Sequence, residues 1–93
     1  MNQYYIYILS NKYRTTFYIG VTNDLNKRVS QHNSNVGSVF TSKYKITDLI
    51  YYETFNNIDI AIAREKQLKN WRKDWKLNLI RSQNPKLETL IIL

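Results

Sequence analysis

Two short runs rich in tyrosine and isoleucine place the strongest constraint on how this chain folds. Residues 3–9 (QYYIYIL) and residues 16–21 (TFYIGV) are dense in aromatic and β-branched side chains, the types favoured in strands. Only the polar connector of residues 10–15 separates them. A parallel pair would need a crossover of a dozen or more residues, so we expect an antiparallel hairpin.

The alternation of side chains along these strands predicts two different sheet faces. Side chains in a strand alternate between faces, and residues that oppose one another share a face. If Tyr7 lies opposite Tyr18, one face is almost wholly apolar and holds Ile6, Ile8 and Ile19. The other face then holds Tyr5, Tyr7, Leu9, Thr16, Tyr18 and Gly20. A slip by one residue would scramble this division, so we expect both tyrosine hydroxyls to leave the core on the same side.

A helix is expected directly after this hairpin. Residues 22–24 (TND) are N-cap candidates, and residues 25–33 (LNKRVSQHN) follow with apolar side chains four positions apart. Arg28 and His32 are also four positions apart and therefore share one stripe of this helix. The pattern thus predicts that an arginine lies beside the single histidine of the chain.

The middle of the chain is expected to form a loop and then a third strand. Residues 34–45 are polar, contain a glycine and include Lys43 and Lys45, which favours a loop. Residues 46–55 (ITDLIYYETF) are again rich in aromatic and β-branched side chains, which predicts a strand.

A long helix from about residue 58 to residue 81, capped by Asn56 or Asn57, is expected next. Its apolar stripe is Ile58, Ala61, Ile62, Leu68, Trp71, Trp75 and Leu79. The stripe has one slot, at position 65, that holds Glu65, and burying a lone carboxylate is costly unless a cation or donors lie beside it. The alternative explanation, an ion pair with Lys69, is worth only about 0.2–0.5 kcal/mol. Glu65 is therefore the strongest single indication of a functional site.

The helical region is expected to end at residues 84–85 (NP), where proline cannot continue a helix. The apolar tail of residues 87–93 (LETLIIL) follows. It either docks on the core or forms an exposed adhesive patch.

The composition indicates one basic domain without cysteine, spanning residues 1–93. Fourteen Lys and Arg against seven Asp and Glu give a formal net charge of +7, which favours anionic partners, most commonly nucleic acid. A basic protein without such a partner is the alternative on charge alone. The absence of cysteine excludes disulfides, thiolate metal ligands and cysteine nucleophiles. Neither a signal peptide nor a membrane-spanning run of ~18–20 apolar residues is recognisable, so we expect a cytoplasmic protein without a membrane partner.

The candidate residues together suit the hydrolysis of a phosphodiester. This reaction needs a proton acceptor near the attacking water, positive charge near the phosphate, and a metal that polarises the phosphate. Glu65 offers hard oxygen ligation for Mg²⁺, and the planar fork of Arg28 suits phosphate oxygens. Each residue taken singly also has a structural explanation, because tyrosines pack well in strands and a helix arginine is by default solvated.

These motifs, in this order, resemble the GIY-YIG nuclease domain over nearly the whole chain. Residues 5–7 (YIY) stand in the place of the first motif, with a tyrosine where that motif has glycine, and residues 18–20 (YIG) match the second motif. Residues 22–28 (TNDLNKR), followed by His32, resemble the helix that carries the family's catalytic arginine. Residues 63–68 (AREKQL) place a glutamate where the family has its metal-binding glutamate. The chain resembles in particular the small stand-alone bacterial members.

The resemblance implies an α/β chain of the α+β type and a role for each matching residue. The fold is a three-stranded antiparallel sheet flanked by helices, in the order β-β-α-β-α with or without a further helix. Tyr7 or Tyr18 is the general base, and the other positions water or phosphate. Arg28 stabilises the transition state, Glu65 holds one divalent ion (Mg²⁺ or Mn²⁺), and His32 assists.

Further residues are expected to support the site or to bind nucleic acid. Tyr5, Gly20 and Asn84 are accessory candidates, and Asn78 competes with Asn84 for the position of an asparagine that the family often adds after the glutamate. The basic side chains expected to bind nucleic acid are Lys43, Lys45, Lys69, Arg72 and Lys73.

The leading hypothesis is a metal-dependent endonuclease that cleaves DNA with little sequence specificity and uses no small-molecule cofactor. We recognise no second domain that reads bases, and phosphate contacts position a protein without specifying a sequence. The alternative is a non-catalytic nucleic-acid-binding module that keeps the fold and the basic surface. A structural protein that interacts through its apolar tail would explain neither Glu65 nor the charge.

Overall fold

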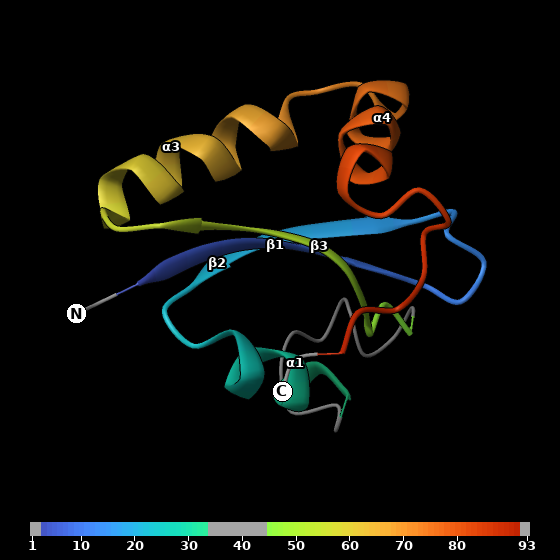
Figure 1. The fold of residues 1–93 in the computed structure, drawn as a ribbon, viewed down its shortest axis with the longest axis horizontal. Helices are drawn as coiled ribbons and strands as arrows, with labels where there is room; N and C mark the ends of the chain where they lie inside the picture. Colours follow the sequence, from blue (N-terminus) through green and yellow to red (C-terminus); the bar gives the residue numbers. More distant parts are fainter. Residues whose placement is uncertain (1–2, 34–44, 92–93) are drawn as a thin grey trace.

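An antiparallel sheet of three strands, in the order β2-β1-β3, lies at the centre of the protein (Figure 1). The structure is a computed structural model and describes residues 3–33 and 45–91. The strands are β1 (Tyr4–Ser10), β2 (Phe17–Thr22) and β3 (Asp48–Phe55). The three predicted strands and the antiparallel hairpin are therefore confirmed, with starts shifted by one or two residues.

The predicted pairing of the hairpin is wrong by two residues, although its alternation is right. Tyr7 lies opposite Gly20, and Tyr18 lies opposite Leu9. Asn11 closes a short turn by accepting the backbone N–H groups of Thr15 and Thr16 at 2.9 and 3.0 Å, and turn geometry sets the register of a hairpin. Because the shift is even, Tyr7 and Tyr18 still share one face.

Helices cover both faces of the sheet (Figure 1). The first face packs against α3 (Ile58–Lys69) and α4 (Lys73–Gln83), and its fully buried side chains include Ile6, Ile8, Ile50, Leu68 and Ile80. The second face lies against α1 (Leu25–Asn33) and the chain that follows α4. Its buried cluster is Tyr7, Leu9, Leu25, Ile46 and Leu49.

The burial of the second face corrects the prediction that the tyrosines on it leave the core. Tyr7 is 2% exposed and belongs to the second buried cluster, whereas Tyr18 is half-buried at its margin. The reason is that Leu25 of α1 and Leu90 of the C-terminal segment cover this face. Sequence alternation identified the shared face but not the layer that covers it.

The helix α1 has the predicted bounds, whereas the predicted long helix is wrong. Asp24 caps α1 by accepting the Lys27 N–H at 3.1 Å. The long helix is divided into α3 and α4: the Asn70 N–H donates to Gln67 O at 3.2 Å, and Arg72 is extended (φ −67°, ψ 157°) as the N-cap of α4. The break turns α4 away from the axis of α3 (Figure 1).

The C-terminal segment docks on the sheet, which decides between the two alternatives for the described part of the tail. Asn84 is 6% exposed and donates to Ile50 O at 2.9 Å and to Glu88 O at 2.7 Å, while its Oδ1 accepts the Glu88 N–H. The Leu90 N–H donates to Leu49 O at 2.7 Å. Asn84 therefore holds the segment onto β3.

Within the described ranges, no helix is both long enough and apolar enough to span a membrane.

A partly buried cluster of Tyr51, Glu53 and Arg64 connects α3 to β3. Arg64 donates from Nε and Nη2 to the two carboxylate oxygens of Glu53, both at 2.9 Å, and the Tyr51 hydroxyl also donates to that carboxylate. Burial raises the pKa of Glu53, but these hydrogen bonds and the charge of Arg64 outweigh it and lower the pKa below its usual value of 4.5. The cluster holds α3, and with it the neighbouring Glu65, in place.

Replacing Asn84 by alanine is expected to destabilise the protein by about 1–3 kcal/mol, because the Ile50 and Glu88 carbonyls lose their donors. Urea unfolding followed by circular dichroism measures this change. Asn78→Ala, at an exposed position of α4, is the matched control and is expected to shift stability by no more than about 0.5 kcal/mol. Equal losses in both variants would contradict the role of Asn84.

Replacing Glu53 by glutamine is expected to make stability less dependent on pH in the acid range. Because folding lowers the pKa of Glu53, its contribution is present above the carboxyl's usual pKa and is lost as pH falls through the folded value. Urea midpoints between about pH 5 and about pH 2 are thus expected to fall less steeply in Glu53→Gln than in wild type. Glu88→Gln, at an exposed position, should keep the wild-type slope. A wild-type slope in Glu53→Gln would contradict the assignment.

Candidate active site

The ring of Tyr7 lies directly over the backbone of Gly20 on the neighbouring strand. A Cβ atom at position 20 would lie 2.5 Å from Tyr7 Cζ and 2.9 Å from Cε1, far inside van der Waals contact. The clash would be with a ring that is 2% exposed and has little room to move. Glycine at position 20 is therefore required by the position of Tyr7, which explains the glycine of the YIG triplet.

The two tyrosines of the motifs lie side by side. The ring centroids of Tyr7 on β1 and Tyr18 on β2 are 6.3 Å apart, and the ring planes are tilted by 40°. Tyr7 is buried under α1, while Tyr18 is half-buried. One phenol is therefore enclosed, and the other lies closer to the solvent.

The pKa of Tyr7, on β1, is influenced by side chains from three other elements of the fold, β2, α1 and α3. Burial raises the pKa of Tyr7 well above its usual value, and Tyr18 raises it further. The charge of Arg28 on α1 lowers this pKa, and the charge of Glu65 on α3 raises it. The predicted tyrosines, arginine and glutamate are thus close enough to act on one hydroxyl.

Arg28 lies at the junction of β2 and α1. It is exposed, and its backbone N–H donates to Asp24 O at 3.1 Å in the first turn of α1. A small cavity of about 140 Å³ opens here, lined by Thr22, Asn23, Asp24, Lys27, Arg28 and Gln31. Sequence reasoning did not include Lys27 and Gln31, although the spacing of three between Arg28 and Gln31 places both on one side of a helix.

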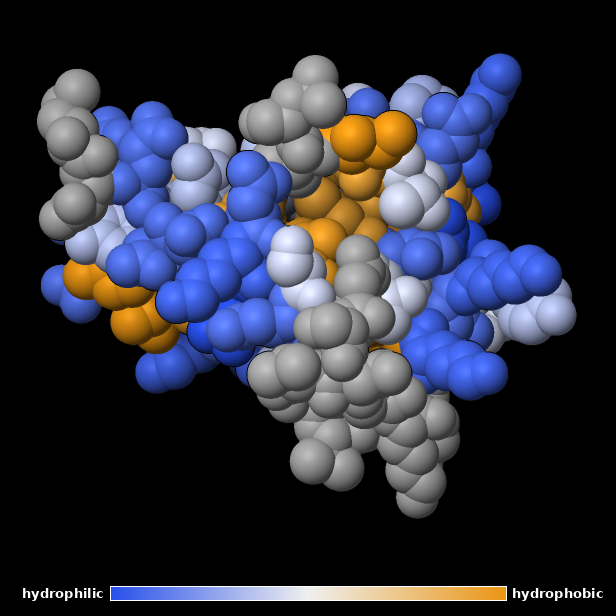
Figure 2. Space-filling model, turned by 90° about the horizontal axis from the view of Figure 1, so that it is seen from below, coloured by the Kyte–Doolittle hydropathy of each residue, from blue (hydrophilic) through white to orange (hydrophobic). Residues whose placement is uncertain are grey.

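The side of the molecule that carries α1 is mainly hydrophilic (Figure 2). In this view, polar and charged side chains surround an apolar area at the centre of the face. The helix α1, which carries the exposed Arg28, lies below the sheet in Figure 1.

Glu65 occupies the slot that the sequence pattern gave it. Its side chain is 17% exposed, and the buried side chains of Ala61 and Leu68 lie on the same helix, α3. Lys69 Nζ lies 3.6 Å from Glu65 Oε2, but the lysine itself is 52% exposed. Such a pair is worth only about 0.2–0.5 kcal/mol, so a divalent cation competes with it readily.

The donor set fits a divalent ion held by a single carboxylate. In residues 3–33 and 45–91, no three His, Cys, Asp or Glu side chains come together as a metal-binding group. Mg²⁺ commonly binds through one or two carboxylates and fills its other positions with water and substrate phosphate. Glu65 can supply such a carboxylate.

The remaining predicted site residues are distributed around this centre. Tyr5 lies opposite Thr22, and its ring and the Tyr52 ring form an edge contact with centroids 6.3 Å apart. His32 belongs to the last turn of α1, but its side chain lies outside the described part of the structure. Asn84 uses its carboxamide to fix the C-terminal segment.

The described basic residues predicted to bind nucleic acid come from α3, from the start of α4 and from the segment before β3. Lys69 lies beside Glu65, and Lys45 is exposed just before β3. Arg72 and Lys73 lie at the start of α4, where Lys73 Nζ donates to Thr15 O at 2.6 Å. Lys43, with most of the expected loop of residues 34–45, lies outside the described residues.

Comparison with known proteins identifies the family of this chain. The GIY-YIG catalytic domain matches residues 3–78, a range that includes Tyr7, Tyr18, Arg28 and Glu65 and ends before Asn84. A UPF0213 protein of Clostridium perfringens is 38% identical over 84 residues, covering 90% of this chain and 89% of the relative. One of Staphylococcus saprophyticus is 34% identical over 80 residues, covering 86% of this chain and 96% of the relative.

A solved structure supports the fold independently. The solution NMR structure of a UPF0213 protein from Bacillus halodurans matches with a TM-score of 0.60 and 25% identity, over 94% of this chain and 92% of that chain. The agreement in fold extends to the three-stranded antiparallel sheet and its helices, in the order β-β-α-β-α-α. The chain therefore belongs to the GIY-YIG catalytic domain family and carries a domain of the endonuclease type.

Proposed function

We propose that this protein is a divalent-metal-dependent endonuclease that hydrolyses phosphodiester bonds in DNA with little sequence preference of its own. One observation carries the proposal: the motif tyrosines Tyr7 and Tyr18 lie side by side, with ring centroids 6.3 Å apart, in a chain whose residues 3–78 match the GIY-YIG catalytic domain. Phosphodiester hydrolysis needs a proton acceptor, positive charge and a metal near one phosphate, and we assign these tasks to the tyrosines, Arg28 and Glu65.

Arg28 binds the phosphate and stabilises the negative charge that builds up on it. It is exposed at the head of α1, beside a cavity that opens to solvent. A guanidinium presents two parallel N–H donors to phosphate oxygens and keeps its charge at any working pH. His32 assists from the same helix, four residues further on.

The two tyrosines differ in burial, and we assign them different tasks. Tyr7 is enclosed, and its raised pKa keeps the proton on its hydroxyl, so Tyr7 positions the substrate or water as a hydrogen-bond donor. Tyr18 is half-buried and lies closer to the solvent, where the attacking water enters. Tyr18 is therefore the residue that we assign as general base.

Glu65 holds one divalent ion, Mg²⁺ or Mn²⁺. The partly buried carboxylate of Glu65, which has the exposed Lys69 beside it, is the ligand of this site. When bound, the ion polarises the phosphate and offsets the charge on the leaving oxygen. Lys69 is released from its pair with Glu65 and is then available to the nucleic-acid backbone.

The exposed basic side chains bind the nucleic-acid backbone and do not distinguish one base sequence from another. The chain carries a net charge of +7, and the exposed cations Lys45, Lys69, Arg72 and Lys73 lie outside the polar cavity at Arg28. Contacts of this kind go to phosphates, which are the same at every base pair, and their strength falls with salt.

Purified protein is expected to nick supercoiled plasmid in the presence of Mg²⁺ or Mn²⁺ and not in EDTA. Glu65→Ala, Arg28→Ala and Tyr18→Phe are each expected to slow nicking by roughly 100-fold or more, because each removes one group that acts at the phosphate. Initial rates of conversion from supercoiled to open-circle plasmid on agarose gels measure the effect.

The matched controls change the same kinds of side chain elsewhere. Asp59→Asn on α3, Lys86→Ala in the C-terminal segment and Tyr13→Phe in the β1–β2 turn are expected to keep the wild-type rate. Nicking that persists in all three site variants would mean a different site. If the protein binds DNA in a salt-dependent way but does not nick it at any metal concentration, the endonuclease proposal is wrong and the protein is a non-catalytic nucleic-acid-binding module.

A further inference from the structure

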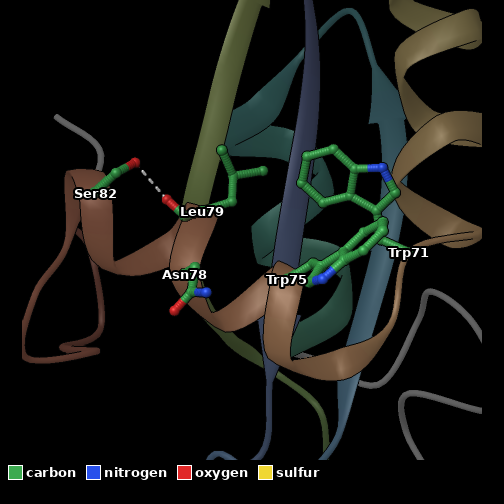
Figure 3. A pocket seen from close by; sticks show the side chains of 5 residues that line it. All are labelled: Trp71, Trp75, Asn78, Leu79 and Ser82. Atoms are coloured by element: carbon green, nitrogen blue, oxygen red, sulfur yellow. Dashed lines mark hydrogen bonds between the residues drawn. The ribbon is translucent and has the colours of Figure 1, made fainter.

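An apolar groove on α4 lies outside the candidate active site (Figure 3). It has a volume of about 340 Å³ and is lined by Trp71, Trp75, Asn78, Leu79 and Ser82, which we call the tryptophan groove. This volume falls within the ~300–1,000 Å³ of small-molecule sites in proteins. Trp71 comes from the break between α3 and α4, and the other four residues come from α4.

The two indoles of the groove have different surroundings. Their ring centroids are 6.0 Å apart and their planes are nearly perpendicular, at 84°. Trp71 is partly buried and packs on the core, whereas Trp75 is 47% exposed. The ring of Trp71 is fixed against the core and packs against the ring of Trp75, which faces solvent. Part of the Trp75 ring is therefore accessible to a ligand.

A guanidinium lies over each of the two rings. The Cζ atom of Arg64 is 5.4 Å from the centroid of Trp71, and that of Arg72 is 4.9 Å from the centroid of Trp75. Arg64 is held by its two hydrogen bonds to Glu53. Arg72 makes an exposed contact to Asp74, at 3.4 Å. Arginine planes and aromatic rings are the surfaces on which unpaired nucleic-acid bases stack.

The net positive charge of the segment that carries the groove indicates the class of ligand. Residues 66–81 carry six basic residues and one acidic residue, which leaves five of the seven net positive charges of the chain on this segment. The basic residues are Lys66, Lys69, Arg72, Lys73, Lys76 and Arg81. A second copy of the chain would bring equal positive charges together, whereas a polyanion with flat apolar bases satisfies both the charge and the rings.

We propose that the tryptophan groove binds an unpaired base of a single-stranded nucleic acid, stacked on Trp75. Arg72 and the neighbouring lysines contact the backbone phosphates, and the exposed carboxamide of Asn78 at the rim meets the edge of the base. Bases within a duplex are already stacked and paired, so the groove selects single-stranded segments.

This inference rests on the proposed function, because it names the form of nucleic acid that the endonuclease takes. The groove and the metal-binding glutamate share helix α3 at their boundary: Arg64, over Trp71, directly precedes Glu65. Lys69, which pairs with Glu65, lies two residues before Trp71. The groove and Glu65 are therefore connected through one helix, α3.

Tryptophan fluorescence tests the groove directly, because Trp71 and Trp75 are the two tryptophans of the chain. The full-length protein is titrated in EDTA with an oligothymidylate of about 12 nucleotides, and with the same strand paired to its complement. We expect the single strand to quench the fluorescence and to bind more tightly than the duplex. Equal quenching and equal affinity for the duplex would overturn the proposal.

Substitutions at Trp75 separate stacking from charge. Trp75→Leu is expected to weaken binding of a labelled oligothymidylate by about fivefold or more, measured by fluorescence anisotropy, whereas Trp75→Tyr keeps most of the affinity because an aromatic face remains. Tyr13→Ala is the matched control, since Tyr13 is 76% exposed and lies 5.9 Å from Lys12 Nζ. Circular dichroism verifies that each variant is folded.

Three results would overturn the proposal: unchanged affinity in Trp75→Leu, an equal loss in Tyr13→Ala, or fluorescence that changes with protein concentration alone because a second copy covers the groove. The binding test needs no cleavage, so the two proposals fail separately. If the protein never nicks DNA but binds single strands through Trp75, the endonuclease proposal is wrong and the groove proposal is supported. If the protein nicks DNA but Trp75 does not contribute to single-strand binding, the groove proposal is wrong and the endonuclease proposal is supported.

Discussion

The contact between the Tyr7 ring and the backbone of Gly20 is the constraint on which the rest of the site depends. Because position 20 has no Cβ, the Tyr7 ring can lie against the Gly20 backbone and stay buried in the cluster that includes Leu25 of α1. Tyr18 is then placed beside it, and the charges of Arg28 and Glu65 reach the same hydroxyl. A side chain at position 20 would displace Tyr7 and with it the relation between sheet and helices.

Much of this arrangement follows from local sequence, and the failures have physical causes. The strands, α1 and the Glu65 slot follow from periodicity and capping residues such as Asp24, which act within a few positions. The register depends on the turn closed by Asn11, and an error of two residues leaves the alternation intact. The burial of Tyr7 depends on Leu90, far along the chain, which no local pattern contains.

The break between α3 and α4 is the feature that the periodic pattern concealed. The apolar steps of three and four continue through Trp71 and Trp75, so the sequence favours one helix. Asn70 and Arg72 instead end one helix and start another, which places Trp71 on the core and leaves Trp75 partly exposed. The proposed metal-binding glutamate and the proposed nucleic-acid groove are thus both connected to α3, where Glu65 follows Arg64 directly.

The central claim is that Tyr7, Tyr18, Arg28 and Glu65 surround one divalent ion and one phosphate. Paramagnetic broadening of the NMR signals of the folded protein by Mn²⁺ tests it most directly, because the effect falls steeply with distance from the ion. The account predicts that substoichiometric Mn²⁺ broadens the signals of Tyr7, Tyr18, Arg28 and Glu65 first, and that Glu65→Gln abolishes this pattern. Broadening centred elsewhere, or unchanged in Glu65→Gln, would contradict it.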